Sequence, residues 1–230
     1  MPTALITGAN RGLGFEFCKQ FLNKKYQVYA CCRNINNATE LQKLKSISHN
    51  QLEIIPLDVE AEESINLLNN HIKHQPIDIL INNAGIFTDY ESDNHLIAKT
   101  WQKFFMINSI APYLITQKLL ENCRASDQKK IINITSGLGS IKQNTEGGYD
   151  PYRASKAALN AITKSLAIEN SSNNIIVIAM SPGWVRTDMG GAGAPLSPEE
   201  AVSGIIKQID KLTAEDTGKF YSYDGRELPW

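Results

Sequence analysis

The sequence lacks the features that mark several large classes of protein. Its 230 residues carry 23 basic and 24 acidic side chains, so no excess of one charge predicts a nucleic-acid partner or an acidic tail. Apolar runs stay short of the ~18 residues that a membrane-spanning helix needs. Because a buried-strand pattern begins at residue 3, no room is left for a signal peptide. We therefore expect a cytoplasmic protein with neither a nucleic-acid nor a membrane partner.

Cysteine and histidine are scarce, with four residues of each type. Cys31 and Cys32 are adjacent in an apparent strand, where neighbouring side chains point to opposite faces. His71 and His74 could share one face of a helix, but no carboxylate or thiol pattern completes a metal site around them. The sequence therefore predicts reduced thiols, solvated histidines and no metal.

Strand-like and helix-like segments alternate along the whole chain. This alternation predicts a parallel sheet covered by helices on both faces. The expected strands cover residues 3–7, 27–32, 52–57, 77–81, 130–135, 175–180 and 219–223. The expected helices cover about 14–24, 37–47, 62–74, 92–106, 109–123, 151–169 and 198–212. Because an α/β chain of this length is usually one domain, we predict an α/β fold with a single domain over residues 1–230 and a doubly wound sheet of about seven strands.

Unusual residues follow the carboxyl ends of the expected strands. A glycine-rich loop at 8–14 follows the first strand, 83–85 follow the fourth, and 182–183 follow the sixth. In open α/β sheets, ligands bind beyond the carboxyl ends of the strands. Ordinary turn residues would gather at the opposite edge as well, so this distribution predicts a ligand site at one edge of the sheet.

The loop at 8–14 has the pattern Gly-x-x-x-Gly-x-Gly, which differs from the Gly-x-Gly-x-x-Gly of the common dinucleotide fingerprint. The physical reasoning is the same for both patterns. Glycines allow a tight turn and a close approach of the backbone, and the helix that follows offers free N–H groups to a pyrophosphate. Glycine-rich turns between strands and helices are nevertheless common, so the loop alone does not identify the ligand.

Tyr152 and Lys156 are spaced i, i+4, which places them on one face of the expected helix. An ammonium beside a phenol favours the phenolate and lowers a tyrosine pKa from its ordinary value of about 10. The same spacing also arises by chance on exposed helix faces. Ser136 lies just beyond the fifth strand, at the same edge of the sheet as the other unusual residues.

Taken together, these motifs resemble the short-chain dehydrogenase/reductase family over the whole chain. In order, they are Thr7-Gly8-x-x-x-Gly12-x-Gly14, Asn82-Asn83-Ala84-Gly85, Asn108, Ser136, Tyr152-x-x-x-Lys156 and Pro182-Gly183. Residues 133–140, 151–153 and 224–230 are similar to the C-factor and Sniffer-type carbonyl reductase branch. The resemblance implies a Rossmann-type fold and a homodimer or homotetramer, paired through the helices at 109–123 and 152–169.

The resemblance also implies roles for four residues in catalysis. Tyr152 is expected to be the general acid or base, and Lys156 to lower the pKa of its phenol and hold the nicotinamide ribose. Ser136 is expected to hydrogen-bond the substrate oxygen, and Asn108 to hold a water that links Lys156 to solvent. The segment after residue 136 is longer than in many members of the family, so Ser140 stays open as an alternative to Ser136.

A nicotinamide dinucleotide is the implied cofactor. Asp58 is expected to bind the adenine amino group, with Val59 against the ring, and 83–85 to line the adenosine ribose. The expected cofactor contacts are Gly8, Asn10, Arg11, Gly12, Leu13, Gly14, Arg33, Asp58, Val59, Asn83, Ala84, Gly85, Tyr152, Lys156, Pro182, Gly183, Val185 and Thr187. The last four of these are expected at the nicotinamide end.

Charge at the end of the second strand favours NADP(H) over NAD(H). An NAD-specific site usually carries an acidic residue there, but this chain has Cys32 followed by Arg33, with Arg11 in the glycine loop. Two guanidinium groups suit the charge-assisted recognition of a 2′-phosphate. The alternative is that Arg33 is only a solvated residue at the end of a strand.

We therefore predict an NADP(H)-dependent oxidoreductase that interconverts a carbonyl and an alcohol. The alternative is a nucleotide-binding regulatory or signalling protein that keeps the fold without turnover. The loops at 137–150 and 184–196 are expected to shape the substrate pocket. Tyr149, Trp184 and Met189 indicate that this pocket is partly apolar, and the substrate itself is not identified.

Overall fold

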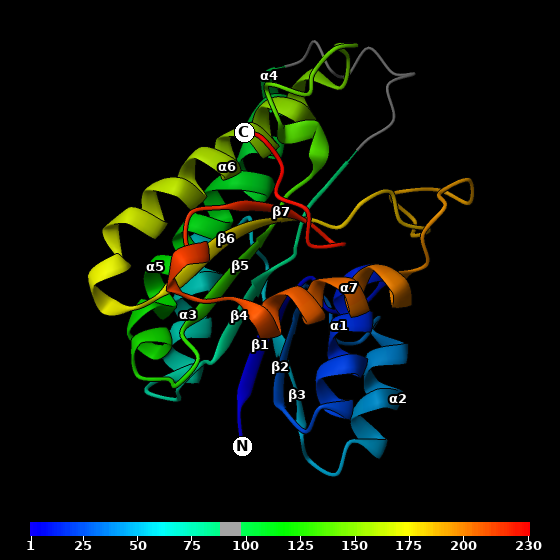
Figure 1. Ribbon diagram of the computed structural model, residues 1–230. Coiled ribbons are helices and arrows are strands. Elements are labelled where there is room, and N and C mark those ends of the chain that lie inside the picture. The colour runs from blue at the N-terminus through cyan, green and yellow to red at the C-terminus, as the bar shows by residue number, and fades with distance from the viewer. Residues whose placement is uncertain (88–97) are drawn as a thin grey trace.

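The computed structural model describes residues 1–87 and 98–230 of the chain. Its centre is a seven-stranded sheet in the order β3-β2-β1-β4-β5-β6-β7, in which every neighbouring pair is parallel (Figure 1). The strands are β1 (Thr3–Thr7), β2 (Gln27–Cys32), β3 (Leu52–Pro56), β4 (Ile79–Asn82), β5 (Lys130–Ile134), β6 (Ile176–Ser181) and β7 (Phe220–Ser222). The predicted α/β fold with a doubly wound parallel sheet is confirmed.

Helices cover both faces of this sheet. They are α1 (Gly12–Asn23), α2 (Thr39–Ile47), α3 (Glu62–Ile72), α4 (Ala98–Phe105), α5 (Ala111–Arg124), α6 (Asp150–Glu169) and α7 (Pro198–Lys211). Helices α1, α2 and α7 lie on one side, and α3, α5 and α6 lie on the other (Figure 1). Successive strand residues serve the two sides in turn, since Ala4 and Ile6 of β1 pack in one core and Leu5 packs in the other. A strand buried on both faces is apolar throughout, which is why the strands read as continuous apolar runs.

The middle helices differ from the prediction of two helices with a junction at Asn108. Positions 92–97 of the first predicted helix lie outside the described residues. From α4, the backbone continues through a π-helical turn, Met106–Ile110, directly into α5. Pro112 has no N–H, so it cannot make the α-helical bond to the carbonyl of Asn108. A widened π turn at this point is the kind of local feature that often accompanies functional sites.

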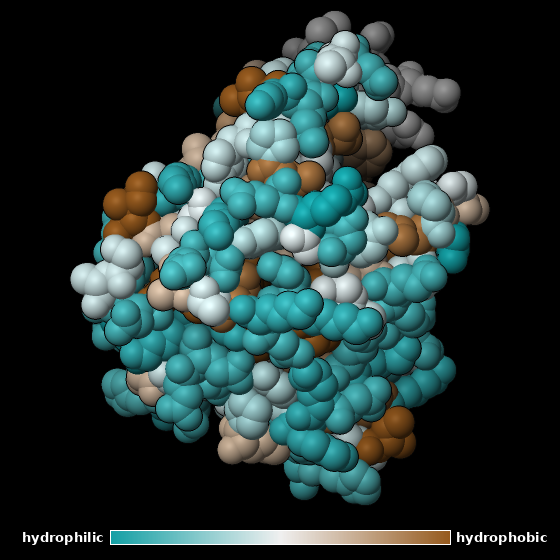
Figure 2. Space-filling model, viewed as in Figure 1, coloured by the Kyte–Doolittle hydropathy of each residue, from teal (hydrophilic) through white to brown (hydrophobic). Residues whose placement is uncertain are grey.

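The surface in Figure 2 is mainly hydrophilic, with scattered hydrophobic residues. Ile110 and Tyr113, where α5 begins, and Ile168 near the end of α6 are among the exposed apolar side chains. These lie on the two helices through which we expect copies of the chain to pair, and this assembly stays a prediction. Among the helices of residues 1–87 and 98–230, none is both long and apolar enough to cross a membrane.

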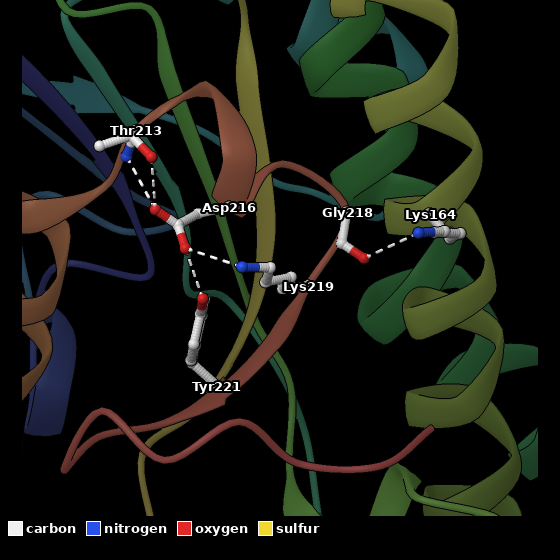
Figure 3. A network of polar contacts seen from close by, with 6 residues as sticks. All are labelled: Lys164, Thr213, Asp216, Gly218, Lys219 and Tyr221. Carbon is white, nitrogen blue, oxygen red and sulfur yellow. Dashed lines mark hydrogen bonds and ion pairs between the residues drawn. The ribbon is translucent and has the colours of Figure 1, made fainter.

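A network of polar contacts joins the end of α7 to β7 (Figure 3). The carboxylate of Asp216 accepts hydrogen bonds from the backbone N–H of Thr213 at 2.9 Å, from the ammonium of Lys219 at 3.2 Å and from the hydroxyl of Tyr221 at 2.6 Å. Burial raises the pKa of Asp216, but these hydrogen bonds outweigh it and lower the pKa to about 2. The ionised carboxylate therefore stabilises the path of the chain into the edge strand.

Asp216→Asn is expected to lower the free energy of unfolding by about 2 kcal/mol at pH 7. The folded pKa of about 2 lies below the ordinary value of 3.8, so the stabilisation is present above about pH 4 and is lost as the pH falls toward 2. Urea unfolding at pH 7 and at lower pH measures this difference. Asp210→Asn is the control, since its exposed pair with Lys24 contributes less than about 1 kcal/mol. Equal losses in the two variants would contradict the prediction.

Candidate active site

A cleft of about 490 Å³ opens at the carboxyl edge of the sheet. Most of the residues predicted to contact a cofactor line it, although they come from distant parts of the chain. These are Gly8, Asn10, Arg11, Gly12, Leu13, Arg33, Asp58, Val59, Asn83, Ala84, Gly85, Tyr152, Lys156, Pro182 and Thr187. Three predicted contacts, Gly14, Gly183 and Val185, lie outside this lining.

The glycine loop is held to the end of β4 by reciprocal hydrogen bonds. The hydroxyl of Thr7 accepts from the backbone N–H groups of Asn83 and Ala84, each at 2.9 Å. In return, the side-chain amide of Asn83 donates to the carbonyl of Thr7 at 2.8 Å. A Cβ at Gly14 would lie only 2.2 Å from the carbonyl oxygen of Gly8. Gly14 therefore serves close packing of α1 against the loop, which explains its position outside the lining.

The N-terminus of α1 faces the cleft without a side-chain cap. Arg11 stands at the N-cap position in an extended conformation, and its side chain makes no capping hydrogen bond. The first turn contains no acidic residue. Gly8 and Gly12 have positive φ angles of 65° and 52°, which glycine adopts without strain. Unpartnered N–H groups at a helix N-terminus bind anions, so this arrangement fits the pyrophosphate of a dinucleotide.

Tyr152 lies in the first turn of α6, opposite the glycine loop. Phe87 packs against its ring edge to face, with centroids 5.0 Å apart, and Phe104 of α4 lies 6.4 Å away. Ser136, just beyond β5, lies close enough to the Tyr152 side chain to oppose the rise in the pKa of its phenol. The ammonium of Lys156 lies 5.9 Å from the centroid of the Tyr152 ring. The structure thus brings together three of the four residues predicted for catalysis.

The pKa of Tyr152 differs from the prediction. We expected Lys156 to lower the pKa of this phenol, but burial raises the pKa, and only the hydrogen bond from Ser136 opposes the increase. Lys156 instead donates to the carbonyl of Ile134 at 2.9 Å, and burial lowers its own pKa to about 8. The ammonium lies over the ring face and donates to a backbone carbonyl, and the role expected of Lys156 toward the phenol stays a prediction. A phenol with a raised pKa stays protonated near neutral pH.

The side chain of Asn108 is fully engaged with other parts of the protein. Its oxygen accepts from the N–H of Ile86 at 2.8 Å, and its amide donates to the carbonyl of Ile86 and the hydroxyl of Ser155, both at 3.0 Å. Ser155 in turn donates to the carbonyl of Tyr152 at 2.8 Å. This side chain joins the cleft wall to the helix of Tyr152. Ser155 was not predicted from the sequence as a residue of the site. Its position directly before Lys156 could have indicated it.

The choice between Ser136 and Ser140 follows from their partners. Ser140 is buried, and its hydroxyl donates to the carbonyl of Pro229 at 2.7 Å and to that of Trp230 at 3.0 Å. Ser136 is the serine that lies beside Tyr152. The structure therefore favours Ser136 as the hydroxyl that faces a substrate.

Acidic residues that sequence analysis missed face both predicted arginines. Arg11 pairs with Asp188 at 2.9 Å across the cleft. Arg33 lies 3.8 Å from Glu60, which also lies 3.7 Å from Lys103 of α4. The acids directly follow predicted residues, Asp188 after Thr187 and Glu60 after Val59, so their positions were the available signal. Exposed ion pairs contribute little free energy, so these arginines can exchange partners for a phosphate at low cost.

Comparisons with known proteins agree with this geometry. Residues 2–195 match the family model for short chain dehydrogenases. The chain belongs to the short-chain dehydrogenase family and is an oxidoreductase.

Within the family, the chain is of the type represented by Sniffer and the C-signal. It is similar to the C-signal of Myxococcus xanthus, with 36% identity over 155 residues, which are 67% of this chain and 93% of that protein. The carbonyl reductase Sniffer of D. melanogaster superposes with a TM-score of 0.93 and 34% identity over 100% of both chains. The NADPH bound carbonyl reductase from chicken fatty liver gives a TM-score of 0.92 and 34% identity, over 100% of this chain and 99% of that one.

Lys156→Met is expected to stabilise the cofactor-free protein by about 2 kcal/mol at pH 7. The pKa of about 8 lies below the ordinary 10.5, so the buried cation costs stability below about pH 8, and the cost fades as the pH rises toward 10.5. The shift corresponds to about 3 kcal/mol, from which the lost bond to the Ile134 carbonyl removes about 1 kcal/mol.

Urea unfolding of the cofactor-free protein at pH 7 and pH ~10 tests this sign, since the gain should vanish at the higher pH. Lys164→Met is the matched control on the same helix, because the exposed Lys164 also donates to a carbonyl, that of Gly218 at 3.2 Å. The Lys164→Met variant should show no gain in stability at pH 7. A Lys156→Met protein less stable than the wild type at pH 7 would overturn the prediction.

Proposed function

We propose that the protein is an NADP(H)-dependent reductase that interconverts a carbonyl and an alcohol, with Tyr152 as its general acid. The observation that carries this proposal is the meeting, at one edge of the sheet, of the half-buried Tyr152 and Ser136 with the uncapped N-terminus of α1. Tyr152 and Ser136 offer a proton and a hydrogen bond to a carbonyl oxygen, and the N-terminus of α1 offers a place for a pyrophosphate.

The chain's own groups account for the proton in this reaction. When bound, the nicotinamide cofactor supplies the hydride. Tyr152 donates its phenolic proton to the carbonyl oxygen, and Ser136 donates a hydrogen bond where negative charge develops on that oxygen. Because burial raises the pKa of Tyr152, the phenol holds its proton until a carbonyl arrives. Lys156, with a pKa of about 8, can return a proton toward the phenolate near neutral pH.

The cleft fits a phosphorylated dinucleotide along its length. We infer that the first turn of α1 holds the pyrophosphate, and that Asp58 and Val59 hold the adenine. Arg33 and Arg11 would hold the 2′-phosphate in place of Glu60 and Asp188, at a strand end where Cys32 leaves no carboxylate to bind a ribose hydroxyl. The pair of carbonyl reductases above includes one described as NADPH bound, which supports this choice.

The alternative of a nucleotide-binding protein without turnover is less well supported. It would require neither a phenol with a raised pKa nor a serine beside that phenol, and Tyr152 and Ser136 supply both. A screen of aldehydes and diketones with NADPH, followed by loss of its absorbance, separates the two functions. Cofactor binding without any turnover would favour the alternative.

Tyr152→Phe is expected to lower turnover by at least the ~10²–10⁴-fold that a positioned acid contributes. The substitution keeps the ring and its packing against Phe87 and Phe104, and removes only the oxygen that carries the proton. Steady-state reduction of a carbonyl with NADPH measures turnover, and fluorescence titration measures cofactor affinity, which should hold nearly constant. Near wild-type turnover in this variant would remove Tyr152 from the mechanism.

Tyr26→Phe is the matched control for this experiment. The hydroxyl of Tyr26, just before β2, accepts a hydrogen bond from the side-chain amide of Gln128 at 2.9 Å, at the edge of the sheet opposite the cleft. Its removal is expected to cost about 1 kcal/mol of stability and to leave turnover and NADPH affinity unchanged.

Arg33→Asp is expected to weaken NADPH binding by at least about tenfold and to leave NADH binding unharmed or improved. The change replaces attraction by repulsion at the 2′-phosphate, beside the existing carboxylate of Glu60. Titration of both nucleotides at one salt concentration gives the ratio of their affinities. Lys43→Asp makes the same charge change on the exposed face of α2 and should alter the affinity for neither nucleotide. If NADPH affinity is equal in the wild type and Arg33→Asp, the charge argument for Arg33 fails.

A further inference from the structure

Beyond β7, the chain turns back and runs antiparallel to that strand. The N–H of Ser222 donates to the carbonyl of Arg226 at 2.8 Å, and the N–H of Leu228 donates to the carbonyl of Phe220 at 2.7 Å. Because β7 is the last strand of the sheet, this return segment covers an otherwise unpaired edge. Figure 1 shows the end of the chain leaving β7 and finishing near α6, on the side of the catalytic helix.

The end of this segment is bound to Ser140. The hydroxyl of Ser140, only 1% exposed, is shared between the carbonyl of Pro229 and the main-chain oxygen of Trp230, and the N–H of Lys142 also donates to that oxygen of Trp230 at 3.2 Å. The ring of Trp230 stacks on that of Phe220, with centroids 5.5 Å apart. Buried hydrogen bonds and a stacked ring together fix residues 227–230 in place.

Ser140 closes the turn that begins at Ser136. Ser136 caps a short 3-10 helix, Gly137–Gly139, by accepting from the N–H of Leu138 at 3.1 Å. The N–H of Ser140 donates to the carbonyl of Gly137 at 3.0 Å. A Cβ at Gly139 would lie 2.9 Å from the backbone carbon of Lys156, so the turn packs directly on α6. A displacement at one end of so short a turn is transmitted to the other end.

We propose that residues 227–230 are a positioning element of the active site: through the hydroxyl of Ser140, they hold the turn that sets the hydroxyl of Ser136 beside Tyr152. Ser140 contacts no reacting atom and is a positioning residue. The effect of these residues on catalysis rests on the proposed function. The coupling between residues 227–230 and the turn at Ser136 rests only on the hydrogen bonds and packing described above.

Ser140→Ala tests the proposal, because it removes the donor to both carbonyls and leaves Ser136 intact. We expect kcat to fall about tenfold, within the ~10²-fold that a 1 Å misplacement can cost, with NADPH affinity unchanged. The hydrogen bond from Ser136 opposes the rise in the pKa of Tyr152, so its loss should move the pH profile of alcohol oxidation to higher pH, as Ser136→Ala also should. Tyr152 is otherwise faced by Lys156 and by two phenyl rings, and no carboxylate of the described residues shifts its pKa.

A second readout does not need turnover. Hydrogen exchange of the Leu138 amide, measured by NMR on the cofactor-free protein, reports whether the bond to Ser136 holds. Ser140→Ala should speed this exchange by at least about tenfold, which corresponds to ~1.4 kcal/mol of local opening free energy. If the wild type turns over no carbonyl, the proposed function fails, while the exchange comparison still decides the coupling.

Ser126→Ala is the matched control. Ser126 is 5% exposed, donates to the carbonyl of Cys123 at 2.8 Å and accepts from the N–H of Lys129 at 3.2 Å, but it precedes β5 at the opposite edge of the sheet. Its loss should lower the melting temperature as Ser140→Ala does, with kcat, pH profile and Leu138 exchange unchanged. If Ser140→Ala matches this control in all three, the proposal is overturned. Should Ser140→Ala fail to fold, Trp230→Ala replaces it: faster Leu138 exchange with intact NADPH affinity supports the proposal, and unchanged exchange overturns it.

Discussion

The buried ammonium of Lys156 is the contact on which the rest of the site depends. It donates to the carbonyl of Ile134 at the end of β5, and so ties the catalytic helix to the centre of the sheet. Among residues 1–87 and 98–230, no carboxylate contributes to the shift of its pKa, which burial lowers to about 8. A charge held in this way costs free energy of folding. Lys156 follows Tyr152 by one turn of α6, and in the proposed function its part in proton transfer offsets this cost, as is common in active sites.

Around this contact, glycine residues allow backbones to approach where a side chain would not fit. Gly139 lets the turn after Ser136 pack on the backbone of Lys156, and Gly14 lets α1 pack on Gly8. The first approach positions the hydroxyl beside Tyr152, and the second positions the uncapped helix end beside the same cleft. In the proposed function, the groups that transfer a proton and the groups that bind an anion are thus both positioned by close packing at a glycine, on opposite sides of β4.

The cleft carries less positive charge than its two arginines alone would give it, because each arginine has an acidic partner. Asp188 pairs with Arg11, and Glu60 lies beside Arg33. A phosphate must displace these carboxylates or share the arginines with them, which reduces the net gain on binding. In our proposal, the selectivity for NADP(H) therefore depends on a difference in free energy. The two states compared are the arginines paired with their carboxylates and the same arginines paired with the 2′-phosphate.

The sequence by itself determined the order of strands and helices, the sheet edge that holds the cleft and the identity of most residues that line it, because these follow from periodicity and from the residues beyond each strand. Tertiary structure decided the pKa shifts and the ion-pair partners of those residues. The rise in the pKa of Tyr152 comes from burial, and the partners of Arg11 and Arg33 come from loops distant in sequence. The choice of Ser136 over Ser140 depended on the return of the C-terminal segment to a turn that it follows by 89 residues. Burial, ion pairing and long-range contacts depend on the packing of distant segments, and no local pattern encodes them.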